Sequence, residues 1–234
     1  MTANLHREIN FEVEICQHLG GHGWLYAEGD AAHYDRARAI FPSDVLAWVQ
    51  TAQPEAWQTF EKNHGAQAAE ILLARLRDQL DQRGTLDVLR KGIELLGLRQ
   101  PLKLAEFKPA LAINAEILAR YTANRLRVVR QVKYSLHNEN CIDLVLFLNG
   151  IPVATVELKT DFTQSVNDAI DQYRFDRLPR SKGHPAEPLL AFPSGAMVHF
   201  AVSNSEAAMV TKLAGPATHS CPSTRATTVG LATR

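Results

Sequence analysis

Apolar positions in the first part of the chain recur at steps of three and four residues, the period of an amphipathic helix. They do so first between Leu5 and Leu19, after which Gly20 and Gly21 end the pattern. The same period covers three later stretches, residues 43–62, 66–82 and 86–97. Residues 1–119 are therefore predicted to form a mainly helical N-terminal part.

The pattern changes near residue 120 to the two-residue alternation of a β-strand. Between Leu126 and Tyr134, apolar residues alternate with arginine, glutamine and lysine. Two strand candidates, a helix candidate and a last strand candidate follow, at residues 142–148, 153–159, 163–177 and 197–203. This order predicts an α/β core, a mixed sheet flanked by helices, over residues 120–215. Residues 216–234 have few large apolar side chains and no period, and we expect an irregular tail there.

The composition supports a packed domain but gives no general argument for nucleic-acid binding. The chain has 234 residues, of which 46% are hydrophobic, and its formal net charge is zero. Any basic surface must therefore come from local clustering. Three widely spaced cysteines without a CxxC motif predict a reduced, cytoplasmic protein. Because no run of about 18 apolar residues is present, no membrane contact is expected.

Two acids and a lysine form the most informative group of residues. Asp143 precedes Glu157 by fourteen residues, and Lys159 follows Glu157 by two, so a strand places Glu157 and Lys159 on one face. Carboxylates supply the hard oxygen ligands that Mg²⁺ prefers. A bound metal polarises a phosphoryl oxygen and activates water, and a lysine offsets the charge that develops on the phosphate. The group predicts Mg²⁺-dependent hydrolysis of phosphodiester bonds, with Asp143 and Glu157 as metal ligands.

The turn between the two central strands decides whether these acids meet. Asn149-Gly150 is a dipeptide typical of hairpins. A strict two-residue turn would pair position 143 with 156 and place Asp143 and Glu157 on opposite faces. A three-residue turn, with Gly150 in the left-handed conformation, pairs 143 with 155, so that the two acids become diagonal neighbours roughly 7–8 Å apart or less. We therefore predict a three-residue turn with a bulge.

The alternative is that both acids are ordinary surface charges of a strand. Two features favour the nuclease interpretation. The acids lie within apolar strands, where an unpaired charge is costly. A basic stretch without acids, residues 120–134, also precedes them and suits contact with phosphates. Its candidate DNA-binding residues are Arg125, Arg127, Arg130 and Lys133. A solvated face remains the alternative for this stretch.

The run NRLRVVRQVKYSLHNENCIDLVLFLNGIPVATVELKTDFTQSVNDAIDQYRFDRLPR resembles the nuclease core of the R subunit of type I restriction enzymes. The similarity extends over about residues 5–215. The resemblance implies a PD-(D/E)xK restriction-endonuclease-like fold, Asp143 and Glu157 as metal ligands, and Lys159 as the catalytic lysine. It implies double-stranded DNA as substrate and the methyltransferase and specificity subunits of a type I restriction complex as partners.

The resemblance also nominates supporting residues. The helix after the strands usually supplies a glutamine and a tyrosine, for which Gln172 and Tyr173 are the matching residues. The spacing differs from the QxxxY of related nucleases, and a core-facing aromatic remains the alternative for Tyr173. Glu12 is the first candidate for a helical acid near the metal. Arg174 and Arg177 are candidates for phosphate contacts, with solvent exposure as the alternative.

Family members continue into ATP-driven motor domains, whereas this sequence carries no Walker motif and diverges from the family after about residue 218. A frameshift near codon 219 is the hypothesis for this divergence, and ATP is expected to act only through motor domains that are absent here. Three readings stay open: an intact Mg²⁺-dependent nuclease domain, a truncated remnant that docks to other subunits without cutting, and a helical interaction module with a small sheet that is unrelated to restriction.

Overall fold

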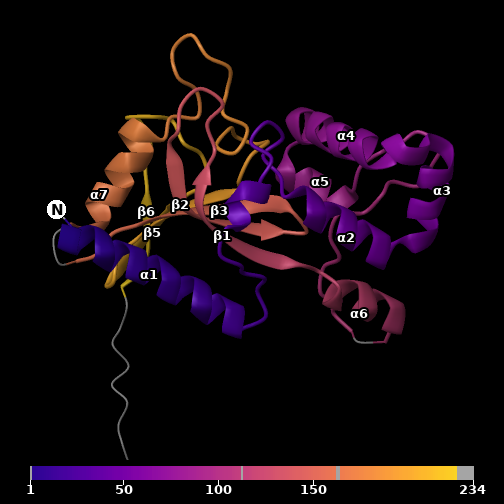
Figure 1. Ribbon diagram of the computed structural model, residues 1–234, viewed down its shortest axis with the longest axis horizontal. Coiled ribbons are helices and arrows are strands. Elements are labelled where there is room, and N and C mark those ends of the chain that lie inside the picture. The colour runs from indigo at the N-terminus through magenta and orange to yellow at the C-terminus, as the bar shows by residue number, and fades with distance from the viewer. Residues whose placement is uncertain (1, 112, 162–163, 226–234) are drawn as a thin grey trace, which may run out of the picture.

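A six-stranded sheet forms the centre of the computed structural model, which describes residues 2–111, 113–161 and 164–225 (Figure 1). The strands lie in the order of the sequence, and every neighbouring pair is antiparallel except β3 and β4. Their bounds are β1 (Leu126–Lys133), β2 (Cys141–Leu148), β3 (Ile151–Leu158), β4 (Val198–Val202), β5 (Glu206–Val210) and β6 (Cys221–Arg225). The predicted α/β fold with a mixed sheet and flanking helices is confirmed.

Helices lie beside this sheet and in a separate group at one end of it (Figure 1). α1 (Thr2–Gly21) contacts β1 and β3, whereas α7 (Val166–Asp171) contacts β3, β4 and β5. The remaining α-helices are α2 (Pro42–Ala52), α3 (Pro54–His64), α4 (Ala68–Arg83), α5 (Thr85–Lys91) and α6 (Ala115–Thr122). Three short turns of other helix types complete the set, η1 (Asp30–His33), η2 (Gly65–Gln67) and η3 (Gln172–Asp176), the last of which is π-helical.

Two predicted helices have different bounds because of proline and glycine. The stretch 43–62 is divided into α2 and α3 at Pro54, which begins the second helix and cannot supply the N–H that would continue the first. The stretch 86–97 ends as α5 at Lys91, because Gly92 takes a left-handed φ of 76° against the backbone of Leu102.

Within the part of the chain that the structure describes, four apolar clusters hold the layers together, of which the smallest lies between α7 and the strands β4 and β5. The helical group buries one cluster around Trp48, Leu72 and Leu76, and Ile151 at the β2–β3 hairpin is buried in the same cluster. A second cluster covers one face of the sheet and includes Tyr173, while a third lies under α1. The helical group is thus packed against the tip of the hairpin. The division of the chain at residue 119 stays a prediction.

The β2–β3 hairpin differs from the predicted form. Leu148 pairs with Ile151, so the turn has two residues, with φ of 50° at Asn149 and 79° at Gly150. The predicted three-residue turn is wrong. The register instead shifts inside the strands, because Phe147 pairs with Pro152 whereas Leu146 pairs with Ala154, and one residue of β3 is left over.

That leftover residue is Val153, so the predicted bulge is present but lies in β3 rather than at the turn. Pro152 precedes it and has no N–H to donate, a residue that sheets accept at bulges. The carbonyl of Val153 accepts a hydrogen bond from the backbone of Met197 at 3.1 Å. The bulge is therefore integrated with the start of β4 and sets the register of everything beyond it.

The tail departs from expectation where the structure describes it. Cys221–Arg225 form β6, which pairs antiparallel with β5, although an irregular segment was predicted. An edge strand needs only a backbone partner, and hydrophobic periodicity does not reveal one. Residues 226–234 of the predicted tail lie outside the described residues. Among the described helices, none is long and apolar enough to cross a membrane.

Candidate active site

The bulge brings Asp143 and Glu157 together across the β2–β3 pair. The last paired positions on this side are Leu144 and Val156, so the next step along both strands places Asp143 opposite Glu157. The backbone N–H of Leu158 donates to Oδ2 of Asp143 at 2.7 Å. The two acids therefore face each other directly, rather than diagonally as predicted.

Glu157 is enclosed, with 0% of its surface exposed. Its Oε1 accepts a hydrogen bond from Nε of Arg177 at 2.6 Å, while its Oε2 is buried without a donor among the described residues, and the carboxyl group lies within hydrogen-bonding reach of the Asp143 carboxyl. Burial, followed by the nearby charge of Asp143, raises the pKa of this carboxyl well above its usual range. An orphaned, buried carboxylate oxygen beside a second acid is an arrangement that a cation would stabilise.

Lys159 follows β3 directly and is buried, two residues beyond Glu157. Lys159 also acts on Asp168 of α7. The pKa of Asp168 is lowered, chiefly by the hydrogen bond from the backbone N–H of Ser165 and to a smaller extent by the positive charge of Lys159. The structure thus places Lys159 at the same end of β3 as the two acids. The catalytic role of Lys159 stays a prediction.

Glu12 on α1 reaches this end of the sheet through Gln131. Nε2 of Gln131 donates to Oε1 of Glu12 at 2.9 Å and lies 3.4 Å from Oδ1 of Asp143. Glu12 is buried, and its pKa is raised mainly by burial, with Asp143 adding to the shift. Glu12 is therefore connected to Asp143 through Gln131, and its role as a helical acid near a metal stays a prediction.

Gln131 itself has an unusual backbone. Its φ is 50°, the left-handed region that L-residues with a side chain rarely adopt, although β1 remains paired with β2 on both sides of it. The position opposite it on β2 is Asp143. Strain of this kind persists where surrounding contacts impose it, and here the amide bridges two acids of the candidate site.

The helical glutamine and tyrosine are placed differently from each other. Tyr173 is buried in the core, and its hydroxyl shares a hydrogen bond of 2.8 Å with Oγ1 of Thr155, so the interpretation as a core-facing aromatic is the better one. Oε1 of Gln172 is buried without a partner among the described residues. Both residues belong to the π-turn η3, in which the N–H of Arg177 bonds to the carbonyl of Gln172 five residues earlier.

The basic residues of β1 and its flanks are engaged with acids of the same chain, and their contact with phosphate stays a prediction. Arg127 contacts Asp44 and Asp30 and lies over the ring of Phe41, with little exposure. Asp30, whose role the sequence left open, is thus a partner of β1. Arg125 contacts Asp44 as well.

Other candidate phosphate contacts also have partners. Arg130 is bound to Glu12, and Lys133 to Glu139. Arg174 donates to the carbonyl of Pro216. Arg177 is bound to Glu157, in the interior. Contact with phosphate stays a prediction for Lys133 and Arg174, whose side chains are half-exposed. Because Arg127 and Arg130 form ion pairs with acids of the chain, these two arginines are less suited to contact phosphate.

The fit to Mg²⁺ rests on a pair of acids rather than a larger cluster. Within residues 2–111, 113–161 and 164–225, no group of three or more His, Cys, Asp or Glu side chains is arranged to hold a metal. Asp143 and Glu157 offer the hard oxygens that Mg²⁺ accepts, and Mg²⁺ commonly keeps several waters with one or two protein carboxylates. The residues present therefore fit a magnesium ion held by this pair.

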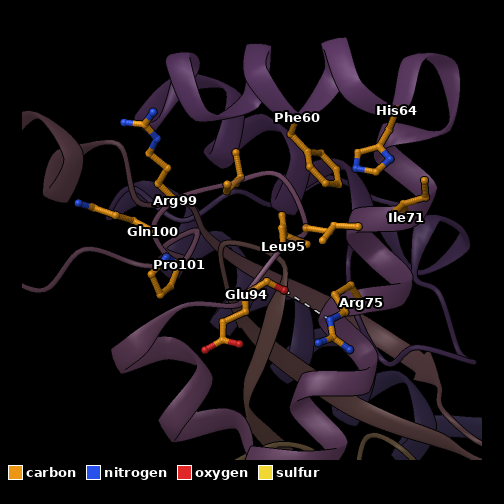
Figure 2. Close-up of a pocket in the computed structure, with 11 residues that line it drawn as sticks. Phe60, His64, Ile71, Arg75, Glu94, Leu95, Arg99, Gln100 and Pro101 are labelled. Carbon is orange, nitrogen blue, oxygen red and sulfur yellow. Dashed lines mark hydrogen bonds between the residues drawn. The ribbon is translucent and has the colours of Figure 1, made fainter.

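Two hollows among the helices, of about 590 and 670 Å³, lie away from the acid pair. Figure 2 shows a pocket of about 590 Å³ between α3, α4 and the segment around Leu95, lined by residues such as Phe60, His64 and Arg99. Neither acid of the pair lines it. A smaller pocket, of about 340 Å³, is lined by Arg177 and so adjoins the acid pair.

Sequence reasoning missed two contacts that shape the site. Arg177 was considered for phosphate, yet it is the partner of Glu157, and the π-turn that places it leaves no clear periodic signal. Gln131 was treated as an alternating polar residue, yet it links Glu12 to Asp143. Both contacts join segments far apart in the sequence, and a single sequence does not reveal them.

A comparison with protein families gives one match. The model of the type I restriction enzyme R protein N terminus matches residues 15–218, most of the chain. The matched range includes Asp143, Glu157, Lys159 and Arg177, whereas Glu12 precedes it. The resemblance drawn from the sequence is confirmed. No individual curated protein matched the chain.

Proposed function

Because the chain belongs to the family of type I restriction enzyme R protein N-terminal domains, we propose that it is the Mg²⁺-dependent DNA endonuclease domain of such an enzyme. One observation carries the proposal. The buried Oε2 of Glu157 has no hydrogen-bond donor among the described residues and lies beside Asp143, on a strand that continues into Lys159. A bound Mg²⁺ would supply charge that polarises the scissile phosphate and lowers the pKa of an attacking water.

The residues of the chain have separate tasks in this proposal. Asp143 and Glu157 hold the ion, and the N–H of Leu158 fixes one oxygen of Asp143. Arg177 fixes one oxygen of Glu157 and leaves the other for the ion. Lys159 orients the attacking water and offsets charge developing on the phosphate. Water is the nucleophile, so no covalent enzyme intermediate forms.

The family match supports a proposal for the biological setting. We place the domain in a type I restriction complex on double-stranded DNA, with methyltransferase and specificity subunits as partners and with site recognition delegated to the specificity subunit. Cutting there would follow ATP-driven translocation by motor domains.

A subunit-docking module without nuclease activity is the second candidate. It is favoured by the guanidinium of Arg177, which already neutralises part of the acid pair. The third reading, a helical interaction module with a small sheet that is unrelated to restriction, is disfavoured by the family match over residues 15–218.

The test is nicking of supercoiled plasmid by the purified chain, with Mg²⁺ and with EDTA. We expect Mg²⁺-dependent nicking that Asp143→Ala abolishes. The matched control is Asp78→Ala, which changes an exposed acid of α4 and should leave nicking intact. A folded wild-type chain that does not nick, or nicking that survives Asp143→Ala, would refute the nuclease proposal.

Metal binding separates the two candidates further. Titration calorimetry should detect Mg²⁺ binding by the wild-type chain and not by Glu157→Gln, because the amide cannot supply a negative oxygen. A docking module would bind methyltransferase and specificity subunits equally well in both variants.

A further inference from the structure

Two loops project from the same end of the sheet (Figure 1), and residues of both line the pocket that Arg177 also lines. One loop joins β1 to β2 and contributes Asn138 and Asn140. The other follows η3 and contributes Ser181 and Glu187. Arg177 lines the pocket and also bonds to Glu157, so the pocket and the candidate site are one side chain apart.

An aromatic side chain at the rim of this pocket is unusually exposed. Phe175, within the π-turn η3, has 53% of its surface exposed. The guanidinium carbon of Arg174 lies 5.5 Å from the centre of its ring, and Arg174 is in turn bonded to the carbonyl of Pro216. The ring is therefore held at the rim rather than packed into the core. π-Turns are frequent at functional sites, where they present a side chain that an α-helix would place elsewhere.

The polar groups of the pocket select the kind of ligand. Arg177 is opposed there by the acids Asp176 and Glu187, so a phosphate would meet more negative than positive charge. Oδ1 of Asn138 accepts a hydrogen bond from the backbone N–H of Asn140 at 2.8 Å, and the side chain of Asn140 bonds to Tyr134. Because an amide has two donor hydrogens and an oxygen with two lone pairs, both side chains keep bonding capacity that suits the edge of an uncharged base. A volume of about 340 Å³ is at the lower end of small-ligand pockets and suffices for a single planar ring system with water.

We propose that this pocket is a subsite for one unstacked nucleobase of the DNA strand whose backbone passes the Asp143–Glu157 pair, with Phe175 as the stacking platform. The proposal rests on the nuclease function proposed above. Every base has a π-face, so stacking on an aromatic ring tolerates sequence, in keeping with cutting that is not sequence-specific. A base taken out of the duplex would also draw the backbone towards the acids.

The test compares two short duplexes, one with a single unpaired 2-aminopurine and one with the same base fully paired, in EDTA so that neither is cut. We expect the wild-type chain to bind the unpaired duplex about 5- to 150-fold more tightly, the range that one base–aromatic stack supplies. The emission of 2-aminopurine should change on binding because the base stacks on Phe175.

Variants of one residue make the test specific. Phe175→Ala and Phe175→Leu should reduce the preference to about onefold, whereas Phe175→Trp should retain it. The matched control is Phe107→Ala, a phenylalanine that is also 53% exposed and lies outside the pocket, which should retain the wild-type preference. Because both phenylalanines are exposed, unchanged thermal unfolding is expected for all four variants.

The outcomes keep the two proposals apart. Equal binding of both duplexes by the wild-type chain, or a preference that survives Phe175→Ala, overturns the subsite even when plasmid nicking requires Mg²⁺ and Asp143. A preference that depends on Phe175 supports the subsite even when no nicking is found, in which case only the nuclease proposal fails.

Discussion

Arg177 donates its Nε–H to Oε1 of Glu157 at 2.6 Å, and the two side chains are 13% and 0% exposed. This ion pair lies between the sheet and the π-turn, and it is the direct link between the predicted metal ligand and the helical segment that follows it. A buried charge that loses its partner is expensive, so the pair is a sensitive point of the fold as well as of the site.

Arg177→Met should lower the free energy of unfolding by about 3–5 kcal/mol, because it leaves the carboxyl of Glu157 buried without its partner. The loss should grow as pH rises. Burial raises the folded pKa of Glu157 above its unfolded value, so charging it above that unfolded pKa costs stability. Urea unfolding at two pH values measures both effects. Arg174→Met, a partly exposed neighbour, should change stability by less than about 0.5 kcal/mol. Equal losses in the two variants would contradict the assignment.

At position 131, substitution by glycine should destabilise the chain less than substitution by alanine, the reverse of the order expected at a neighbouring position of β1. The φ of 50° favours a residue without a Cβ, so Gln131→Gly should be about 1 kcal/mol more stable than Gln131→Ala in urea. Both variants lose the same amide contacts to Glu12 and Asp143, so this loss does not affect the difference in stability between them. At Lys133, which does not have a positive φ, the order should reverse, with alanine more stable than glycine by roughly 0.5–1 kcal/mol. The same order at both positions would refute the strained backbone.

Gly150→Ala should disrupt the hairpin tip. A Cβ there would lie 2.4 Å from the carbonyl oxygen of Phe41 and 2.7 Å from Cγ2 of Val45, in addition to an unfavourable φ of 79°. We expect a loss of about 2–4 kcal/mol in the free energy of unfolding. Gly183→Ala is the matched control, with a φ of 83° and open space around its Cβ, and should cost only about 1–2 kcal/mol. Similar losses at both positions would show that α2 does not pack closely on the turn.

His199 should make stability depend on pH in mildly acidic solution. Burial lowers the pKa of its imidazole from 6.5 to about 4, so the unfolded chain binds more protons between these values. The stability that His199 contributes is complete above pH 6.5 and declines as pH falls towards 4, by about 3 kcal/mol in total. His199→Gln keeps a polar group beside Thr155 and should flatten this dependence in urea unfolding at pH 7 and pH 4.5. A dependence as steep as that of the wild type would exclude His199 as the source.

The sequence predicted the architecture better than the contacts that join its parts. The apolar pattern located the three central strands, of which β2 carries Asp143 and β3 carries Glu157, because apolar side chains are buried on both faces of the sheet. Pro54 and Gly92 changed helix bounds through backbone chemistry that periodicity alone ignores.

The site was only partly foreseen for the same reason. The acids were identified by residue type, and the need for a bulge by register. The bulge lies at Val153 because of Pro152 and of the contact between Val153 and Met197. That contact is not revealed by the hairpin sequence. The arginines of β1 were predicted to face DNA because Asp30, Asp44 and Glu12, their partners, lie far away along the chain.

Because of the bulge at Val153, the acids face each other only when the number of positions that separates them is even. Across an unbroken two-residue turn, facing residues are separated by an odd number of positions, as Leu148 and Ile151 are. Asp143 and Glu157 are separated by an even number, fourteen, and can face each other only because one residue is inserted. Loss of a single codon between them would turn one acid away from the other while every residue type of the motif remained. In chains of this kind, insertions and deletions in the hairpin therefore threaten the site more than most substitutions there do.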